Sequence, residues 1–172
     1  MRIVLLERTH DRERFDCGEE SLNAFLKEHA RKYADLGFSV TYVLTADDSS
    51  EILAYYTIAG GEFDCELLPA TSRKGLPRHA VPVIRLCRLA TDLTQRGKGL
   101  GEIMLLDVLR RAVSISEQLG VHAIEVDALS DAARTYYRKY GFQSLLNDPD
   151  HLYLAIETAR RLLPDRKTIP GG

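Results

Sequence analysis

Long apolar runs are absent from this chain of 172 residues. Unbroken apolar runs, such as residues 4–6 and 104–106, are a handful of residues long and far shorter than the roughly 20 apolar residues that a helix needs to cross a bilayer. The N-terminal apolar stretch is also too short for the core of a signal peptide, and charged residues follow it at once. We therefore expect a cytoplasmic protein that has no membrane segment.

Cysteine is scarce, and histidine is scattered. Cys17, Cys65 and Cys87 are odd in number and far apart, and none belongs to a Cys-x-x-Cys pair. The sequence therefore favours neither a disulfide framework nor a zinc site. The five histidines show no His-x-x-x-His spacing, and we expect no metal.

The overall composition is that of an ordinary globular protein, with 45% hydrophobic and 28% charged residues. Internal repeats, low-complexity tracts and interdomain linkers are not visible, and the length suits one domain. We expect a single domain over residues 1–172, in which the polar end from about 165 to 172 forms a flexible tail.

Charge is distributed unevenly although the net charge is only −2. Residues 1–70 carry 7 basic and 14 acidic side chains, whereas residues 71–111 carry 9 basic and 3 acidic ones. A basic middle between acidic parts indicates that an anionic ligand is held locally, and chance clustering is the alternative.

Hydrophobic periodicity predicts strands that alternate with helices along the chain. An amphipathic helix is expected over 19–35, a long apolar-rich helix over 101–119, and a third helix over 130–140 that Ser130 caps and Gly141 ends. The expected strands lie at 2–6, 38–45, 52–60, 81–90, 121–127, 142–146 and 151–156, and the second and third form a hairpin. Residues 64–80 are expected to be a loop or a short helix, and a helical turn should follow the last strand. This interleaving predicts an α/β protein with one mixed sheet.

A glycine-rich turn between a buried strand and the long helix is the strongest sign of a ligand site. It contains Gly97, Gly99 and Gly101, with Arg96 and Lys98 beside them. Such a turn gathers backbone N–H groups at the positive end of a helix dipole, where a phosphate or pyrophosphate binds. The spacing fits neither the P-loop nor the Rossmann fingerprint, and a tight turn without a ligand is the alternative.

Two motifs in this order resemble those of the GCN5-related N-acetyltransferases, the GNAT family. The first is Arg96-x-x-Gly99-x-Gly101, which resembles the acetyl-CoA signature Arg/Gln-x-x-Gly-x-Gly/Ala. The second, Ala-x-x-x-Tyr-x-x-x-Gly-Phe, lies at 133–142. Segments 15–32, 41–63 and 147–157 further resemble the acetyltransferase toxins of bacterial toxin–antitoxin pairs, so that the resemblance covers nearly the whole chain.

The resemblance implies a single-domain GNAT fold and acetyl-CoA as the cosubstrate. The sheet of this fold is mixed and mostly antiparallel, is flanked by helices, and splays apart at its central parallel strands. The pantetheine arm would pair with the strand edge around Leu89 and Thr91. The pyrophosphate would lie on the backbone amides of Arg96, Gly97, Lys98, Gly99, Leu100, Gly101 and Glu102.

The resemblance also implies that Tyr137 is the catalytic residue. It matches the tyrosine that usually donates a proton to the departing thiolate, and a phenol of pKa about 10 can protonate a thiolate whose acid has a pKa near 8.5. Tyr136 would be a core aromatic residue, and Tyr140 would pack or lie partly exposed. Packing is the alternative role for any tyrosine in such a helix.

The sequence identifies no general base. Asp92, Glu62 and Asp127 are candidates only because carboxylates can serve, and solvent or a weakly basic amine would make a base unnecessary. Arg85 and Arg88 lie on the buried strand and should point to opposite faces. Each would form either a structural ion pair or a contact to an anionic substrate.

For the acceptor, the toxin resemblance implies the α-amine of aminoacyl-tRNA, whose acetylation would block translation. It also implies a neutralising antitoxin, and it leaves a homodimer open. An acetyltransferase of a small amine or a protein amine is the alternative, and a catalytically silent acetyl-CoA-binding module is a further one.

Binding tRNA requires a surface that contacts phosphates. The basic residues that could supply it are Arg73, Lys74, Arg78, Arg96, Lys98, Arg110 and Arg111. The sequence pI of about 6.2 and the acidic residues 1–70 argue against a tRNA partner, so the same cations could instead neutralise only the phosphates of coenzyme A.

Overall fold

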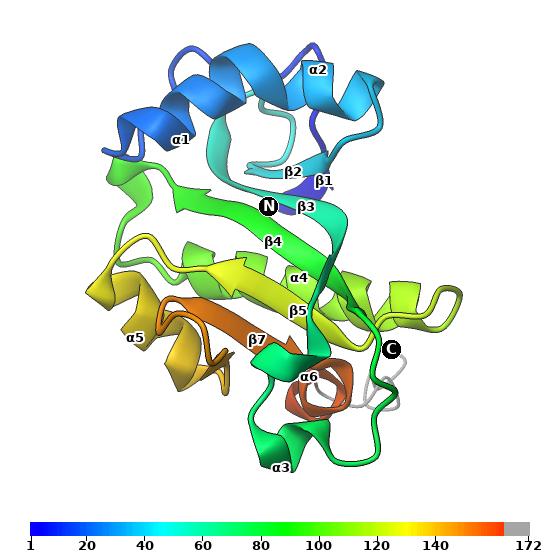
Figure 1. Ribbon diagram of the computed structural model, residues 1–172. Helices are drawn as coiled ribbons and strands as arrows, with labels where there is room; N and C mark the ends of the chain where they lie inside the picture. The colour runs from blue at the N-terminus through cyan, green and yellow to red at the C-terminus, as the bar shows by residue number, and fades with distance from the viewer. Residues whose placement is uncertain (164–172) are drawn as a thin grey trace, which may run out of the picture. The chain divides into compact units, whose positions relative to one another are not determined.

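The computed structural model describes residues 1–163, and the tail expected at 165–172 lies outside these residues. The strands form one mixed, mostly antiparallel sheet of seven strands in the order β1-β2-β3-β4-β5-β7-β6 (Figure 1). Helices accompany these strands, so the predicted α/β class is confirmed. The chain divides into two compact units, residues 1–60 with 85–108, and residues 61–84 with those from 109 onward.

The first unit contains most of the N-terminal strands and the start of the long helix. Its elements are β1 (Arg2–Leu5), α1 (Glu20–Ala24), the π-helical turn η1 (Phe25–His29), α2 (Ala30–Asp35), β2 (Val40–Thr45), most of β3 (Ile52–Phe63), the end of β4 (Val81–Thr91), the turn η3 (Leu93–Gln95) and the first half of α4 (Leu100–Ser116). β2 pairs antiparallel with both β1 and β3, which confirms the predicted hairpin.

The predicted helix over 19–35 forms as one helical stretch in which η1 joins α1 to α2. Its apolar stripe includes Phe25, Leu26 and Ala30, which are almost completely buried against Val43 and Tyr55 of the sheet. This burial of one helix face is the usual reason that such a periodic segment is helical in a protein.

Two adjacent tyrosines of β3 show that helices cover both faces of the sheet in the first unit. Tyr55 donates a hydrogen bond of 2.8 Å to the carbonyl oxygen of Leu22 in α1. Tyr56 donates one of 2.6 Å to the carboxylate of Asp107 in α4. Successive side chains of a strand point to opposite faces, so α1 and α4 lie on opposite sides of β3.

The second unit contains the C-terminal strands and helices. Its own elements are η2 (Cys65–Leu67), α3 (Ala70–Arg73), β5 (Ala123–Asp127), α5 (Asp131–Lys139), β6 (Gln143–Ser144), β7 (His151–Ala155) and α6 (Ile156–Leu162). β7 pairs antiparallel with β5 and with β6. Its core contains buried side chains from these elements and from the adjoining parts of β3 and β4, among them Phe63, Leu68, Val83, Ala123 and Tyr153.

The largest boundary differences are at the end of β3, which continues to Phe63 instead of stopping at 60, and at the end of α4, which stops at Ser116 although Gly120 predicts a later end. The hydroxyl of Ser116 donates to the carbonyl of Val113, and the N–H of Glu117 donates to the carbonyl of Ser114. These three-residue steps tighten the last turn, as often happens at helix ends.

None of the helices within residues 1–163 combines the length and the apolar character that a membrane crossing requires. The same residues bring together no group of three or more His, Cys, Asp or Glu side chains that could hold a metal ion.

Candidate active site

Asp92 organises the turn that follows β4. One carboxylate oxygen accepts hydrogen bonds from the N–H and the hydroxyl of Thr94, at 2.9 and 2.6 Å. The other accepts one of 3.0 Å from the N–H of Asp16. Asp92 therefore caps η3 and joins it to the N-terminal segment.

Two residues of the glycine-rich turn require the backbone freedom of glycine. Gly97 and Gly99 both have φ of +76°, a conformation that glycine adopts without strain. A Cβ added to either would have no atom within 4 Å, so the space above both residues is open. Gly101 instead lies inside the first turn of α4.

The start of α4 presents backbone donors that no helix carbonyl can satisfy. The first four-residue bond of the helix runs from the N–H of Ile103 to the carbonyl of Gly99, at 3.2 Å. The amides of Leu100, Gly101 and Glu102 precede it and therefore have no acceptor within the helix. With the helix dipole, they form a place that suits an anion.

The structure divides the predicted cradle residues into two groups. The amides of Arg96 and Lys98 donate within the turn, to the carbonyls of Leu93 and Gln95. The guanidinium of Arg96 donates to the carbonyl of Cys17, at 2.8 Å, and the ammonium of Lys98 donates to the side chain of Gln95, at 3.0 Å. The amides of residues 96 and 98 are therefore already hydrogen-bonded within the turn. The amides at the start of α4 have no acceptor within the helix, so they are the better candidates to bind an anion.

Leu89 and Thr91 lie at the end of β4, where both are half-buried. Pairing with β3 continues to the end of the strand, because the N–H of Asp92 donates to the carbonyl of Leu53, at 3.0 Å.

Tyr137 lies in α5, in the second unit. The helix begins as predicted, since the hydroxyl of Ser130 accepts a hydrogen bond from the N–H of Ala133. Tyr137 is only 7% exposed, and its ring lies 5.4 Å from those of Tyr136 and Phe142, measured between centroids. Tyr136, the preceding residue, is half-buried. Tyr137 is therefore the more deeply buried of these two adjacent tyrosines.

Burial raises the pKa of Tyr137 above its ordinary value near 10, because the phenolate would lose its hydration. The phenol is therefore fully protonated at neutral pH. A group in this state can donate a proton or a hydrogen bond to a negative charge that develops next to it.

The three carboxylates considered as bases lie in different surroundings. Burial would raise the pKa of Asp92, but the hydrogen bonds from Thr94 and from the N–H of Asp16 lower it on balance. Asp92 is therefore a structural carboxylate that is poorly suited to accept a proton. Glu62 and Asp127 are exposed.

Of the two arginines predicted on the buried strand, Arg88 stacks on an aromatic ring. Its guanidinium carbon lies 3.5 Å from the centre of the Phe25 ring, in a cation–π contact. Within residues 1–163, no acidic side chain forms an ion pair with it. The structural ion pair considered for this strand is therefore not made by Arg88.

The N-terminal segment supports the turn in a way that sequence analysis missed. Besides its bond to Asp92, Asp16 accepts hydrogen bonds from the N–H of Gly18 and the amide of Asn23, both at 2.8 Å. The carbonyl oxygen of Cys17 accepts the hydrogen bond from the guanidinium of Arg96. These partners are more than 70 residues apart, so no local sequence signal links them to the turn.

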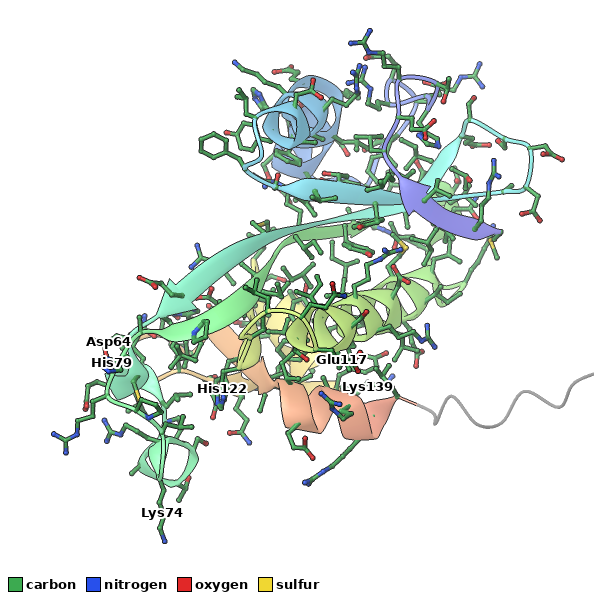
Figure 2. All side chains as sticks on the ribbon, turned by 90° about the vertical axis from the view of Figure 1, so that its right-hand side faces the viewer. Asp64, Lys74, His79, Glu117, His122 and Lys139 are labelled. Carbon is green, nitrogen blue, oxygen red and sulfur yellow. The ribbon has the colours of Figure 1, made fainter. Side chains whose placement is uncertain are left out.

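The predicted basic residues fall into separate places. Arg73, Lys74 and Arg78 line a depression of about 540 Å³ beside α3, where Arg73 also pairs with Glu66. Figure 2 shows Lys74 projecting outward from this segment. Arg96 and Lys98 belong to the first unit, and Arg110 and Arg111 to the second.

Comparison with known proteins shows which family this chain belongs to. The family model described as the acetyltransferase (GNAT) family matches residues 6–142. The chain belongs to this family. It is therefore an N-acetyltransferase, and the acetyl donor of GNAT enzymes is acetyl-CoA, which confirms the family resemblance and the predicted cosubstrate.

Two similar proteins, one of them represented by two solved structures, narrow the group within the GNAT family. A tRNA-acetylating toxin of Mycobacterium tuberculosis is 36% identical over 151 residues, which cover 88% of this chain and 89% of the relative. The structure of AtaT complexed with acetyl-methionyl-tRNA has a TM-score of 0.88 and 30% identity, and the match covers 94% of this chain and 98% of AtaT. A Tyr-to-Phe mutant of AtaT bound to acetyl-CoA and the C-terminus of the antitoxin AtaR has a TM-score of 0.79 and 29% identity, over 94% and 96% of the two chains.

Proposed function

We propose that this GNAT acetyltransferase is a toxin that acetylates the α-amine of aminoacyl-tRNA and thereby blocks translation. The observation that carries the proposal is the similarity, over nearly nine tenths of both chains, to a protein named as a tRNA-acetylating toxin. AtaT, which matches 94% of the present chain, has a solved structure in complex with acetyl-methionyl-tRNA.

For acetyl-CoA, we propose that the turn after β4 is the binding site. The open space above Gly97 and Gly99 admits the pyrophosphate close to the backbone. The amides of Leu100, Gly101 and Glu102 would donate to it, since they have no acceptor within α4. Arg96 and Lys98 would add positive charge, and the edge of β4 at Leu89 and Thr91 would pair with the pantetheine arm.

Tyr137 is the proposed proton donor. Acetyl-CoA supplies the acetyl group as a thioester. As the carbon–nitrogen bond to the acceptor amine forms and the carbon–sulfur bond breaks, the phenol of Tyr137 gives its proton to the departing sulfur. The phenol is protonated when each cycle starts, and burial, which raises its pKa, keeps it so.

The acceptor nitrogen must lose its own protons to react, and no dedicated base is proposed. The low pKa of Asp92 makes this carboxylate unsuitable, so solvent would take the protons. An α-amine next to an ester is less basic than a lysine side chain and is therefore more often neutral at pH 7. This property suits an acceptor site that lacks a base.

The cell biology that follows is also part of the proposal. Charged tRNA is a cytoplasmic molecule, so the enzyme would act in the cytoplasm. The structure of AtaT with the C-terminus of its antitoxin supports a cognate antitoxin for this chain. We also propose that residues 1–172 form a single acetyltransferase domain.

The test is to incubate the protein with labelled acetyl-CoA and a pool of charged tRNA, over a series of salt concentrations. Acetylated aminoacyl-tRNA should form, and its rate should fall steeply with salt because phosphate contacts release counterions when they form. Uncharged tRNA serves as the control, since it has no α-amine and should take no label.

Two other results would replace the proposal. Acetylation of a free polyamine or peptide, with none of charged tRNA at low salt, would identify a small-amine or protein acetyltransferase. Tight acetyl-CoA binding without thiol release, whatever amine is offered, would identify a silent binding module.

A further inference from the structure

A row of aromatic side chains rises from the core of the first unit to its surface. Phe25 is 3% exposed, and its ring meets that of Tyr33 edge-on at 5.6 Å between centroids. The Tyr33 ring in turn lies 6.1 Å from Phe38 and 6.0 Å from His29. Tyr33 is 39% and Phe38 70% exposed, so the row ends in an aromatic side chain that is mostly open to solvent.

The end of α2 explains why Phe38 joins this row but does not explain its exposure. Gly37 adopts φ of +74° and reverses the chain, and the N–H groups of Gly37 and Phe38 donate to the carbonyls of Ala34 and Tyr33. This is the usual glycine cap of a helix, which brings the next apolar residue back onto the last turn. A cap contact alone would not require a large ring that leaves most of its surface in water.

The buried end of the row carries a positive charge. The guanidinium of Arg88 lies on the face of Phe25, 3.5 Å from the ring centre. Stacking holds the planar group in place, while its N–H donors have no acidic partner within residues 1–163. A fixed guanidinium in this state is suited to a phosphate, which it can bind through two parallel hydrogen bonds.

Further cations stand on the same helical stretch. Lys27, Arg31 and Lys32 form no ion pair within the described residues, and Arg12 is tied to this stretch by a 2.9 Å hydrogen bond to the carbonyl of Lys27. The acidic side chains of this stretch are Glu20, Glu28 and Asp35, and a carboxylate oxygen of Glu28 lies 3.8 Å from a ring nitrogen of His29. Cations and acids are therefore equal in number on this helical stretch and Arg12 adds one positive charge, whereas residues 1–70 as a whole are acidic.

Exposed rings among cations are the means by which proteins bind unpaired nucleotides, since bases stack on the rings and phosphates meet the cations. Aromatic residues and arginine are also enriched at protein interfaces, whereas lysine is depleted there, so Lys27 and Lys32 beside the rings favour RNA over a docked protein. We propose that Phe38, Tyr33 and Arg88 form an acceptor-binding strip for a single-stranded RNA end. Phe38 and Tyr33 would stack bases, and Arg88 would hold a phosphate.

This inference rests on the proposed function, because it assigns the strip to the unpaired 3′ end that carries the aminoacyl group. It adds a prediction of its own, which is that affinity for the RNA end depends on the π-faces of the row. The strip also bears on the charge objection to a tRNA partner, since the helical stretch that carries it is not acidic overall, unlike residues 1–70 as a whole.

The experiment measures the binding of a fluorescently labelled single-stranded oligoribonucleotide, matching a tRNA 3′ end, by polarisation. Phe38→Ala should weaken binding by about tenfold, in line with the loss of one stacked base, and Phe38→Trp should restore it. Leu36→Ala is the matched control, because Leu36 is 60% exposed on the same segment but has no ring. Arg88→Lys, which keeps the charge and removes the planar fork, should also weaken binding.

Kinetics complete the test. With charged tRNA as the acceptor, Phe38→Ala should raise KM and leave kcat and the KM for acetyl-CoA unchanged. With an amino acid ethyl ester, which has no nucleotide, the same variant should match the wild type.

The outcomes separate the two proposals. If the wild type acetylates charged tRNA but Phe38→Ala binds the oligonucleotide and the tRNA normally, only the strip is wrong. A change of oligomeric state in Phe38→Ala, seen by light scattering with unaltered RNA affinity, would also overturn the strip and identify a protein interface. If the wild type neither binds the oligonucleotide nor acetylates charged tRNA, both proposals fail.

Discussion

At the scale of single residues, burial decides what Tyr137 can contribute. A phenol that is 7% exposed among Tyr136 and Phe142 ionises with difficulty, so it is held as a neutral acid. The phenol is therefore protonated at neutral pH. Its role as proton donor therefore predicts a loss of turnover without a loss of binding when the hydroxyl is removed.

Tyr137→Phe should lower kcat by about 10²- to 10⁴-fold, as the loss of a general acid does, and should leave the Kd of acetyl-CoA unchanged. Steady-state kinetics and calorimetry measure the two quantities. Tyr136→Phe and Tyr140→Phe are the controls and should retain turnover. Full activity of Tyr137→Phe with a large loss in Tyr136→Phe would place the proton donor one residue earlier.

The raised pKa of Tyr137 can be measured directly. An ordinary tyrosine ionises near pH 10, whereas Tyr137 should remain a neutral phenol there because burial penalises the phenolate. In a spectrophotometric titration of tyrosinate, the wild type and Tyr137→Phe should therefore coincide up to about pH 10 and separate only above it. A difference between them that is complete by pH 10 would contradict the burial argument.

At the scale of elements, the turn between β4 and α4 combines two demands on the backbone. Gly97 and Gly99 adopt a left-handed conformation, and α4 must begin within one residue of them, at Leu100. The N-terminal segment holds the turn through Asp92 and Arg96. Two effects of substituting a glycine in this turn can be told apart: backbone strain and the loss of space for a ligand. A glycine elsewhere that also has positive φ serves as the comparison, because its substitution causes the strain alone.

Gly99→Asp should abolish acetyl-CoA binding, because a carboxylate would enter the open space beside the helix start and repel the pyrophosphate. Gly75→Asp is the matched control, since Gly75 also has positive φ (+81°) and no atom within 4 Å of an added Cβ. Both variants should lose about 1 kcal/mol of stability from backbone strain. Calorimetry should find normal acetyl-CoA affinity in Gly75→Asp, and an equal loss of affinity in both variants would count against the assigned site.

At the scale of the whole molecule, two deeply buried phenols connect stability to pH. Burial raises the pKa of both Tyr55 and Tyr137. Below about pH 10 these phenols are protonated in the folded and unfolded states alike, so they add no pH dependence. Above that pH the unfolded chain ionises first, and the folded state loses stability relative to it.

The free energy of unfolding should therefore decrease above about pH 10, by up to about 1.4 kcal/mol per pH unit for each buried phenol. Chemical denaturation at a series of pH values measures the slope. Tyr137→Phe should have a shallower slope than the wild type, whereas Leu36→Ala, which changes an exposed side chain that does not titrate, should not alter it. An unchanged slope in Tyr137→Phe would mean that this phenol ionises normally in the folded protein.

The sequence by itself determined the α/β class, the order of the elements, the cap at Ser130 and membership of the GNAT family. Each of these depends on local periodicity, on single residues at helix ends or on short motifs, which are visible along the chain. The glycine turn was predictable for the same reason, since glycine is the residue that supplies positive φ. Tyr137 as proton donor and residues 96–102 as the pyrophosphate site stay predictions.

Only the tertiary structure decided what several charged residues do. Asp92 braces the N-terminal segment instead of remaining available as a base, Arg96 turns to Cys17, and Arg88 stacks on Phe25. These contacts join residues more than 60 positions apart, and no local pattern encodes the partner of a long charged side chain. The cost of leaving such groups without hydrogen bonds or charge partners is resolved only when distant segments pack together.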